Sequence, residues 1–450
     1  MSISGSRGGR YIGVYDMMND VYILNPALQI IGLIDSHSSL IWANRYKEVG
    51  DCELYVPANQ NNLALLKKNN YLFRLDDEMV CIIRKVELTT DPDDGNYLTV
   101  TGYDVKSWLD QRVIWGTMTA NGSAEDFARE MVDSALGSTA AADRVLKDGN
   151  GRQMLFLGAS AGFPDILNEQ ASYKNVGEKI RDYCKRYGWG YRVRFDSENA
   201  RFLFSIYKGA DRSDSVIFSG NYENLRETTY IEDETNMGNV ALIAGEGEGA
   251  ARFRTVAGDV EGIARHEIYV DAKDISTTIT YGELKKTFPL QSSGGQGYWS
   301  GNVYYMAMIG IQILDDYQLN RLQTDYPDGT IVTVDDVEYY QLLNQPIAEC
   351  EDASGLTDND NVKLYDLVYE VYLLARGFED LAEYGSVTSF NGTVEPNTTF
   401  VFKKDYFLGD IVTVENEYGI TVEARIVEIV EVSDDNGYYV EPKFEYIQEE

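Results

Sequence analysis

The sequence predicts a β-rich α+β protein of several domains, and three observations support this prediction. The chain has 450 residues, more than the roughly 250 to 300 at which a single hydrophobic core stops growing. Residues 12–112 and 387–446 both show short apolar runs separated by turn residues, which is typical of antiparallel strands. Between these ends lie segments with helical spacing of apolar residues, so we expect helices mainly in the middle of the chain.

The clearest N-terminal element is a hairpin. Two β-rich runs, 80–89 and 96–103, flank a turn rich in Pro, Asp and Gly at 91–95. A short helix is expected at 59–68, because this segment has three leucines and little β-branching.

Two helices are predicted after residue 120. Ser123 begins a capping-box pattern, and an apolar stripe follows it until Gly137. A second stripe covers 175–187, with Asn175 as N-cap and Gly188 as the stop. A hairpin at 191–195 and 201–208 completes an α+β domain, for which we expect the bounds 121–227.

Strands return at 228–276, and the C-terminal residues 386–450 again alternate strands with turns. The Gly-rich and acidic stretch between them is hard to interpret, and we treat 282–385 as an inserted subdomain. Its helix is expected at 361–376, because leucines and valines recur there at helical spacing before Gly377.

The composition argues against nucleic-acid binding and histidine-based catalysis. The 39 Lys and Arg against 73 Asp and Glu give a net charge of −34, and no basic stripe is visible. There are 33 Tyr but only two His. Tyrosine suits both the faces of sheets and large wet interfaces, and filling of sheet faces is the simpler interpretation.

The four cysteines, at 52, 81, 184 and 350, lie far apart without a C-x-x-C pair, so no zinc or redox motif is present. Cys184 falls on the apolar stripe of the second helix, where we expect it to pack as a small hydrophobe. No segment approaches the roughly 20 apolar residues of a membrane span, and no signal peptide is visible. We therefore expect synthesis in a cytoplasm with reduced thiols.

Several motifs contain residue types that occur in ligand sites. The stretch Gly245–Gly249 lacks the Lys-Ser/Thr of a phosphate-binding loop, so a tight turn or a close backbone approach is the better interpretation. The acidic clusters at 76–78, 335–336 and 358–360 raise calcium sites and glycosidase carboxylate pairs as possibilities. None matches a calcium-loop pattern, and solvated turns are expected instead.

Nucleophilic catalysis would need a base. Ser36 and His37 are adjacent and His266 lies elsewhere, but no nucleophile elbow accompanies either histidine. The Asn-x-Ser/Thr triplets at Asn121, Asn391 and Asn397 would matter only in a eukaryotic secretory route. We therefore predict no enzyme activity, and no catalytic, cofactor-binding or metal-binding residue.

Six sequence blocks in order carry a resemblance to a known family. In the N-terminal region they are residues 22–35, 39–46 and 50–57 (YILNPALQIIGLID, SLIWANRY and GDCELYVP). Later they are 241–249, 268–276 and 405–414 (ALIAGEGEG, IYVDAKDIS and DYFLGDIVTV). They closely resemble the ReqiPepy-type siphovirus tail protein family. The resemblance covers most of the chain, although the region 277–360 is longer than the family leads us to expect.

The resemblance implies a structural hub of a phage tail tip or baseplate. Such a hub has two antiparallel β-barrel-like tube domains, here expected at 1–120 and at 228–281 with 386–450. Three copies would close a pseudo-hexameric ring that joins a six-fold tail tube to a three-fold tip and lines the DNA channel. The implied partners are copies of the chain itself, tail tube and distal tail proteins, the tape measure protein and spike or fibre proteins. DNA would pass without specific binding, the host surface would be met indirectly, and no cofactor is implied.

Two alternatives from other classes remain open. A host-glycan-binding tail protein would use exposed aromatic platforms such as Tyr298 with Trp299, or Trp189. A cell-wall or polysaccharide hydrolase would need two positioned carboxylates, for which the sequence supplies no motif.

Overall fold

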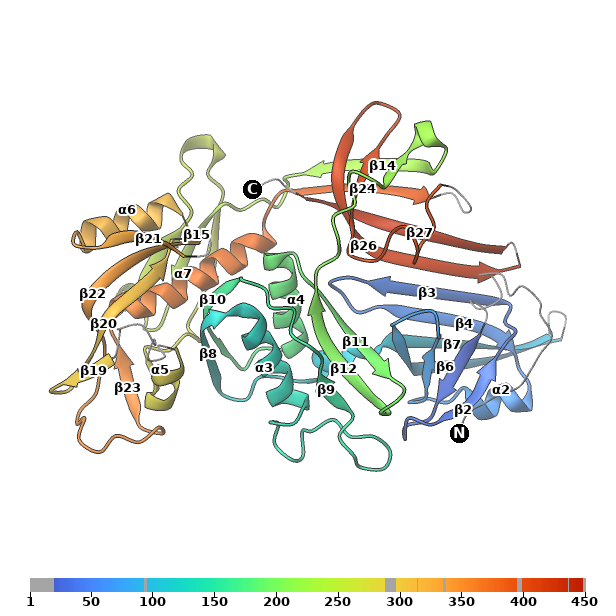
Figure 1. Ribbon diagram of the computed structural model, residues 1–450, viewed down its shortest axis with the longest axis horizontal. Helices are drawn as coiled ribbons and strands as arrows, with labels where there is room; N and C mark the ends of the chain where they lie inside the picture. Colours follow the sequence, from blue (N-terminus) through green and yellow to red (C-terminus); the bar gives the residue numbers. More distant parts are fainter. Residues whose placement is uncertain are drawn as a thin grey trace.

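The computed structural model describes residues 20–92, 95–287, 297–313, 315–334, 337–394, 399–435 and 437–447. Figure 1 shows a β-rich α+β molecule with few helices, as the sequence predicts. None of the helices in these ranges is long and apolar enough to cross a membrane.

The largest element is a 13-stranded sheet that contains strands from both ends of the chain. The N-terminal strands are β1 (Val21–Leu24), β2 (Ile30–Ile34), β3 (Ser39–Arg45), β4 (Asp51–Pro57), β5 (Tyr71–Phe73), β6 (Val80–Asp91) and β7 (Gly95–Asp104). The later strands are β13 (Ile217–Ser219), β14 (Leu225–Asp233), β24 (Val387–Val394), β25 (Ile411–Glu415), β26 (Thr421–Asp434) and β27 (Gly437–Tyr446). Their order is β14-β24-β27-β26-β3-β4-β7-β6-β5-β1-β2, with β25 beside β26 and β13 beside β25.

The pairing of β3 with β26, which we call the seam, joins the two ends of the chain into this one sheet (Figure 1). Each side of the seam keeps its own hydrophobic core, one built around Trp42, Leu54 and Val100 and the other around Phe218, Val412 and Phe444. The strand order runs from β14 to β2 without returning to its start among the described strands. The barrel-like arrangement expected for each tube domain is therefore not confirmed.

The α+β region follows the sequence prediction closely. It contains β8 (Thr117–Ser123), α3 (Ala124–Leu136), β9 (Leu155–Leu157), β10 (Ile166–Ser172), α4 (Val176–Tyr187), β11 (Gly190–Asp196) and β12 (Arg201–Tyr207). Ser123 caps α3 and Asn175 caps α4, each accepting a backbone N–H three residues later. Gly188 ends α4 at φ +65°, a conformation that glycine adopts without steric cost.

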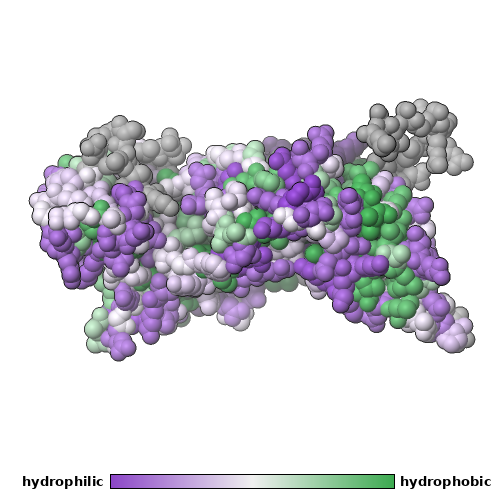
Figure 2. All heavy atoms as spheres, turned by 90° about the horizontal axis from the view of Figure 1, so that it is seen from below, coloured by the Kyte–Doolittle hydropathy of each residue, from purple (hydrophilic) through white to green (hydrophobic). Residues whose placement is uncertain are grey.

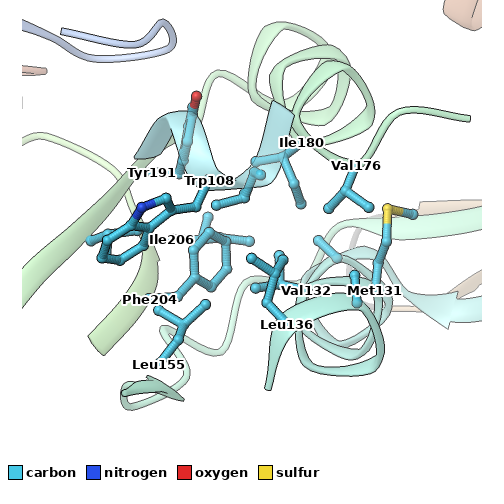
Figure 3. Packing of buried hydrophobic residues seen from close by; sticks show 14 of the residues in the cluster. Trp108, Met131, Val132, Leu136, Leu155, Val176, Ile180, Tyr191, Phe204 and Ile206 are labelled. Atoms are coloured by element: carbon cyan, nitrogen blue, oxygen red, sulfur yellow. The ribbon is translucent and has the colours of Figure 1, made fainter. Parts of the chain in front are cut away.

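The core of the α+β region is continuous with the N-terminal strands. Figure 3 shows Trp108, which follows β7, packed with Phe204 and Leu155 and close to the apolar faces of α3 and α4. Leu24 and Tyr71 of the first strands belong to the same cluster. These two regions therefore share a core, although the sequence suggests two separate domains.

The remaining residues form a second body around α7 (Asp366–Glu383) (Figure 1). One of its sheets has β15 (Val240–Ala244), β16 (Arg254–Ala257) and β17 (Glu267–Asp271). The other has β18 (Thr278–Thr280), β19 (Gly297–Ser300), β20 (Val303–Gln312), β21 (Thr330–Val334), β22 (Val337–Glu349) and β23 (Asn361–Leu364). Helices α5 (Tyr281–Thr287) and α6 (Asp316–Asp325) complete the body.

This grouping differs from the expected one. The sequence predicts that residues 228–281 belong with 386–450, but β15, β16 and β17 share one hydrophobic cluster with the inserted strands and α7. Of the strands in 228–281, β14 is the one that joins the main sheet, where it pairs with β24. The apolar faces of β15 and β16 pack on α7, and this contact decides the grouping.

Two predicted helices have different bounds. The N-terminal one is α2 (Gln60–Leu65), capped by Asn59, and it is shorter than the expected 59–68. The helix expected at 361–376 is wrong at both ends, because residues 361–364 form β23 and α7 runs from 366 to 383. The short segments η1 (Val105–Gln111), η2 (Gly220–Tyr222), η3 (Gly249–Ala251) and η4 (Gly262–Ala264) are 3-10 helices.

Gly377 lies inside α7 because the helix approaches the sheet closely there. A Cβ atom at this position would come within 2.3 Å of Cδ1 of Ile243 and 3.3 Å of Cβ of Ala257. The glycine therefore marks helix-to-sheet contact and not a helix end.

Gly377→Ala should lower the free energy of unfolding by about 1 to 3 kcal/mol, because the added methyl group overpacks the contact with Ile243. The urea midpoint of the purified chain measures this. Gly385→Ala is the control, since its nearest neighbour would lie 4.0 Å away. Equal midpoints for the two variants would contradict the explanation.

Candidate functional site

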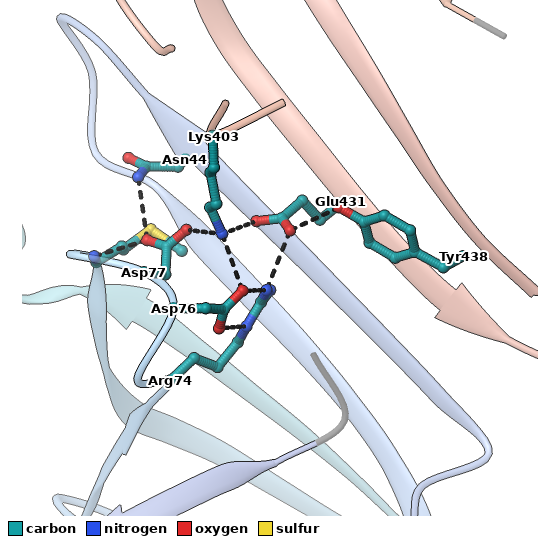
Figure 4. Close-up of polar contacts among 8 residues, drawn as sticks. Asn44, Arg74, Asp76, Asp77, Lys403, Glu431 and Tyr438 are labelled. Atoms are coloured by element: carbon teal, nitrogen blue, oxygen red, sulfur yellow. Dashed lines mark hydrogen bonds and ion pairs between the residues drawn. The ribbon is translucent and has the colours of Figure 1, made fainter. Parts of the chain in front are cut away.

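A group of charged side chains lies beside the seam and links segments from opposite ends of the chain (Figure 4). This charged cluster consists of Arg74, Asp76, Asp77, Lys403 and Glu431. The first three come from the turn between β5 and β6, Lys403 from the segment before β25, and Glu431 from β26.

Arg74 is the buried centre of the charged cluster, at 2% exposure. Its Nε and Nη2 atoms donate to the two oxygens of Asp76 at 3.0 and 2.5 Å, a bidentate arrangement. Nη2 also lies 3.0 Å from Oε2 of Glu431. The guanidinium thus connects the turn after β5 with β26 across the seam.

Lys403 supplies the second positive charge. Its Nζ lies 2.9 Å from Asp77, 3.0 Å from Glu431 and 3.2 Å from Asp76. The hydroxyl of Tyr438 donates to Oε2 of Glu431 at 2.8 Å. With these contacts the three carboxylates of the charged cluster have cationic or hydrogen-bonding partners, which buried charges require.

The electrostatics keep the carboxylates of Asp76 and Asp77 ionised. Burial acts to raise the pKa of Asp76, but the hydrogen bond and attraction of Arg74 outweigh it, and the pKa is lowered. Burial also opposes ionisation of Asp77, whose pKa is nevertheless lowered by Lys403 and Arg74. The pKa of Lys403 is raised, against the effect of burial, by Asp77 and Glu431. Asp76, Asp77 and Lys403 therefore act as fixed charges at neutral pH.

A cleft of about 580 Å³ lies next to the charged cluster, where the N-terminal strands, the β11–β12 hairpin and residues 402–410 meet. Its cations have partners within the chain. Nζ of Lys106 donates to the carbonyl oxygens of Arg45 and Glu48 at 2.6 and 2.7 Å. Arg192 pairs with Glu78 at 2.5 Å. These contacts hold the N-terminal segments to each other and to the β11–β12 hairpin, so the cleft wall serves as a joint between them.

A second ionic network fastens the α+β region to the body around α7. Nζ of Lys179, on α4, lies 2.7 Å from Glu169 and also bonds Glu379 of α7. Arg376 of α7 contacts Asp274 at 3.2 Å and Glu379 at 3.4 Å. Burial acts against ionisation of Glu379, but Lys179 and Arg376 outweigh it and lower its pKa.

The residues considered from sequence lie in separate places. His37 precedes β3, and burial followed by the charge of Arg74 lowers its pKa. His266 is exposed and precedes β17, in a different sheet. The structure thus does not bring the two histidines into one site.

Gly245–Gly249 forms a turn with a close contact, as predicted. A Cβ atom on Gly245 would come within 2.3 Å of the hydroxyl oxygen of Tyr369, which accepts the N–H of Glu246 at 2.7 Å. Gly247 has φ +111°. Both observations explain the glycines without a phosphate ligand.

The acidic clusters have different outcomes. The expectation of a solvated turn is wrong for 76–78, because Asp76 and Asp77 belong to the charged cluster. Asp358 and Asp360 are exposed, as expected for a surface turn. Asp358 accepts from Lys285, and Asp360 accepts from Thr357. Asp335, Asp336 and Asn397 lie outside the described residues. Within the described ranges, no three His, Cys, Asp or Glu side chains are grouped as metal ligands.

The aromatic residues considered as glycan platforms differ from one another in exposure, and three of the four cysteines are buried. Trp189 is fully buried and therefore offers no surface for a glycan. Tyr298 is 46% exposed, while Trp299 beside it is half-buried. Cys52, Cys81 and Cys184 are buried and Cys350 is half-buried, all as free thiols. Cys184 thus packs as the sequence predicts.

Lys403→Met should lower the free energy of unfolding by about 3 kcal/mol, because it leaves the buried carboxylate of Asp77 without its closest cation. Urea denaturation measures the loss. Lys85→Met removes an exposed pair with Glu87 and should have no measurable effect. The prediction fails when the two variants unfold at the same urea concentration.

Acidification should weaken the seam. The pKa values of Asp76 and Asp77 are lower in the folded chain than the value near 3.9 of an unfolded aspartate. Their stabilising contribution is therefore complete above pH about 5 and is lost as the pH falls through the folded values. Asp77→Asn should flatten the fall in unfolding free energy between pH about 5 and 2, measured by urea titrations. Asp358→Asn, at an exposed side chain, should leave the slope unchanged.

Comparison with solved structures finds phage and prophage tail proteins. The tail protein from Neisseria meningitidis MC58 is 9% identical with a TM-score of 0.46, covering 95% of this chain and 96% of that chain. The 43 kDa tail protein of prophage MuSo2 from Shewanella oneidensis is 10% identical with a TM-score of 0.45, covering 94% and 98%. Prophage tail protein gp18 from Listeria monocytogenes EGD-e is 10% identical with a TM-score of 0.44, covering 96% and 95%. The search of curated proteins finds no match.

The comparison with protein families finds a match over most of the chain. The family described as Siphovirus ReqiPepy6 Gp37-like protein matches residues 20–444. This range contains all six sequence blocks and also the long region 277–360. The chain therefore belongs to the Siphovirus ReqiPepy6 Gp37-like family of phage tail proteins.

Proposed function

We propose that this tail protein is a structural hub of the tail tip or baseplate. Three copies form a ring that joins a six-fold tail tube to a three-fold tip and lines the DNA channel. The observation that carries the proposal is the seam, where β3 and β26 place two strand-rich units side by side in one sheet. Three chains with two such units each supply six positions around an axis.

The contacts at the seam support a mechanical role for this joint. Arg45 donates to Glu428 at 2.8 Å, and Lys47 pairs with Glu445 at 3.0 Å. The N–H of Tyr46 donates to the carbonyl oxygen of Val427 at 2.8 Å. Together with the charged cluster, these contacts fix the angle between the two units, which a ring of constant radius needs.

The net charge of −34 supports passage of DNA without adhesion, because a surface rich in carboxylates repels phosphate. In this role the chain is made in the host cytoplasm and ends in the virion tail. Its partners are the tail tube and distal tail proteins, the tape measure protein and the spike or fibre proteins. The role is mechanical and not catalytic, since the cations of the cleft and the charged cluster hold the chain's own segments together.

Mass measurement of the purified chain and electron microscopy of intact virions test the hub. The expected result is density for this chain encircling the channel at the tail tip, in a copy number divisible by three. Density for single copies on an outer fibre would overturn the proposal and favour a receptor-binding role. In that case, glycan-array binding that is lost in Tyr298→Ala would identify the exposed aromatic ring as the contact.

A further inference from the structure

The main sheet ends at both sides in a strand with one unpaired edge. In the described part of the chain, β2 pairs with β1 alone and β14 pairs with β24 alone. Such an edge presents a row of free N–H and C=O groups that can accept another strand. The two free edges lie at opposite ends of the same sheet (Figure 1).

The β2 edge is unusually apolar. Its sequence is IIGLI, and Ile30, Ile31 and Leu33 are 58%, 41% and 37% exposed. α2 packs on one face of the strand, where a Cβ atom on Gly32 would meet Leu65 at 2.6 Å, and it adds the exposed Leu63. Figure 2 shows a patch of hydrophobic residues at this end of the molecule.

Monomeric proteins usually protect an edge strand from pairing with other chains by a lysine, a proline or a β-bulge in that strand. β2 contains no charge or proline, although its pairing with β1 has a bulge at Ile31. An apolar patch at an unpaired edge is typical of a surface that is covered in the assembled state.

The β14 edge has complementary properties. Its last residues carry Ile231, which is 42% exposed, and the exposed acidic side chains of Glu232 and Asp233. The exposed cations Lys67 and Lys68 come directly after α2, the helix that packs on β2. At one end of the sheet, an apolar strand packs against a helix that is followed by two lysines, and at the other end β14 carries an exposed isoleucine and two carboxylates.

The seam shows that this chain forms such a joint. At the seam a strand of the N-terminal unit pairs, antiparallel and edge to edge, with a strand of the C-terminal unit. β2 lies on the same side of the seam as β3, and β14 lies on the same side as β26. A contact between β2 of one copy and β14 of another would therefore also join an N-terminal strand to a strand from the other side of the seam. Because the two edges are different surfaces, the contact is head-to-tail, and successive contacts of this type close into a ring when the rotation allows it.

We propose that β2 of one copy pairs with β14 of a second copy, so that the sheets of neighbouring subunits become continuous. The inference rests on the proposed hub, and it identifies the surfaces through which the copies meet. Backbone hydrogen bonds provide the pairing, Ile30, Ile31 and Leu33 are covered, and the lysines after α2 face the carboxylates at the end of β14.

The test uses the full chain, with sedimentation velocity over a range of concentrations. Ile31→Asp should weaken self-association at least about tenfold, because it puts a charge at the covered edge and faces the carboxylates of β14. Leu242→Asp is the matched control. Leu242 is 40% exposed, close to the 41% of Ile31, but its strand β15 is paired on both edges. The control should associate like the unmodified chain, and circular dichroism checks that both variants fold.

Hydrogen exchange gives a second readout. In the associated state the amides of both β2 and β14 should exchange more slowly than in the monomer, while those of β1 stay equally protected. Association without this change, or equal association of the two variants, would overturn the pairing. A chain that stays monomeric at its highest soluble concentration also overturns it. Electron microscopy of the virion tests the proposed hub separately. A ring of this chain whose copies meet through other surfaces would refute the pairing of β2 with β14 and leave the hub standing.

Discussion

The antiparallel pairing of β3 with β26 is the interaction on which the rest of the architecture depends. It pairs two strands that lie more than three hundred residues apart in the chain, and it thereby makes one sheet with a core on each side. The pairing depends in turn on buried charges, because Arg74 and Lys403 hold carboxylates from both sides of the joint. A seam made of hydrogen bonds alone would allow the two units to hinge, whereas ion pairs with few alternative geometries restrict their relative angle.

Local signals explain which parts of the fold could be predicted from sequence. Ser123, Asn175 and Gly188 satisfy backbone groups within a few residues, so the ends of α3 and α4 could be predicted correctly. The β6–β7 hairpin is equally local, since its turn residues and flanking strands are adjacent in the chain. Gly377 illustrates the limit of this approach. The same residue that ends helices elsewhere lies within α7, and only the neighbouring Ile243 explains why.

The candidate site could not be predicted for a different reason. Lys403 and Asp76 are 327 positions apart, and each looks like an ordinary surface charge in its own segment. A cluster of Asp and Glu is usually solvated, and only the fold shows that Asp77 is buried against a lysine from the far end of the chain. Family resemblance gave the role of a tail protein, but the side chains that hold its two halves together follow from the structure alone.

The seam also has a consequence for biosynthesis. Arg45 and its partner Glu428 are separated by 383 positions, so at 5 to 20 residues per second a ribosome needs roughly 20 to 80 s to supply the second after the first. Throughout that interval β3 has no neighbour on the side that β26 later occupies. Nascent chains on one polysome therefore expose identical unpaired strands to each other, and the yield of soluble protein depends on how quickly translation delivers the last hairpin.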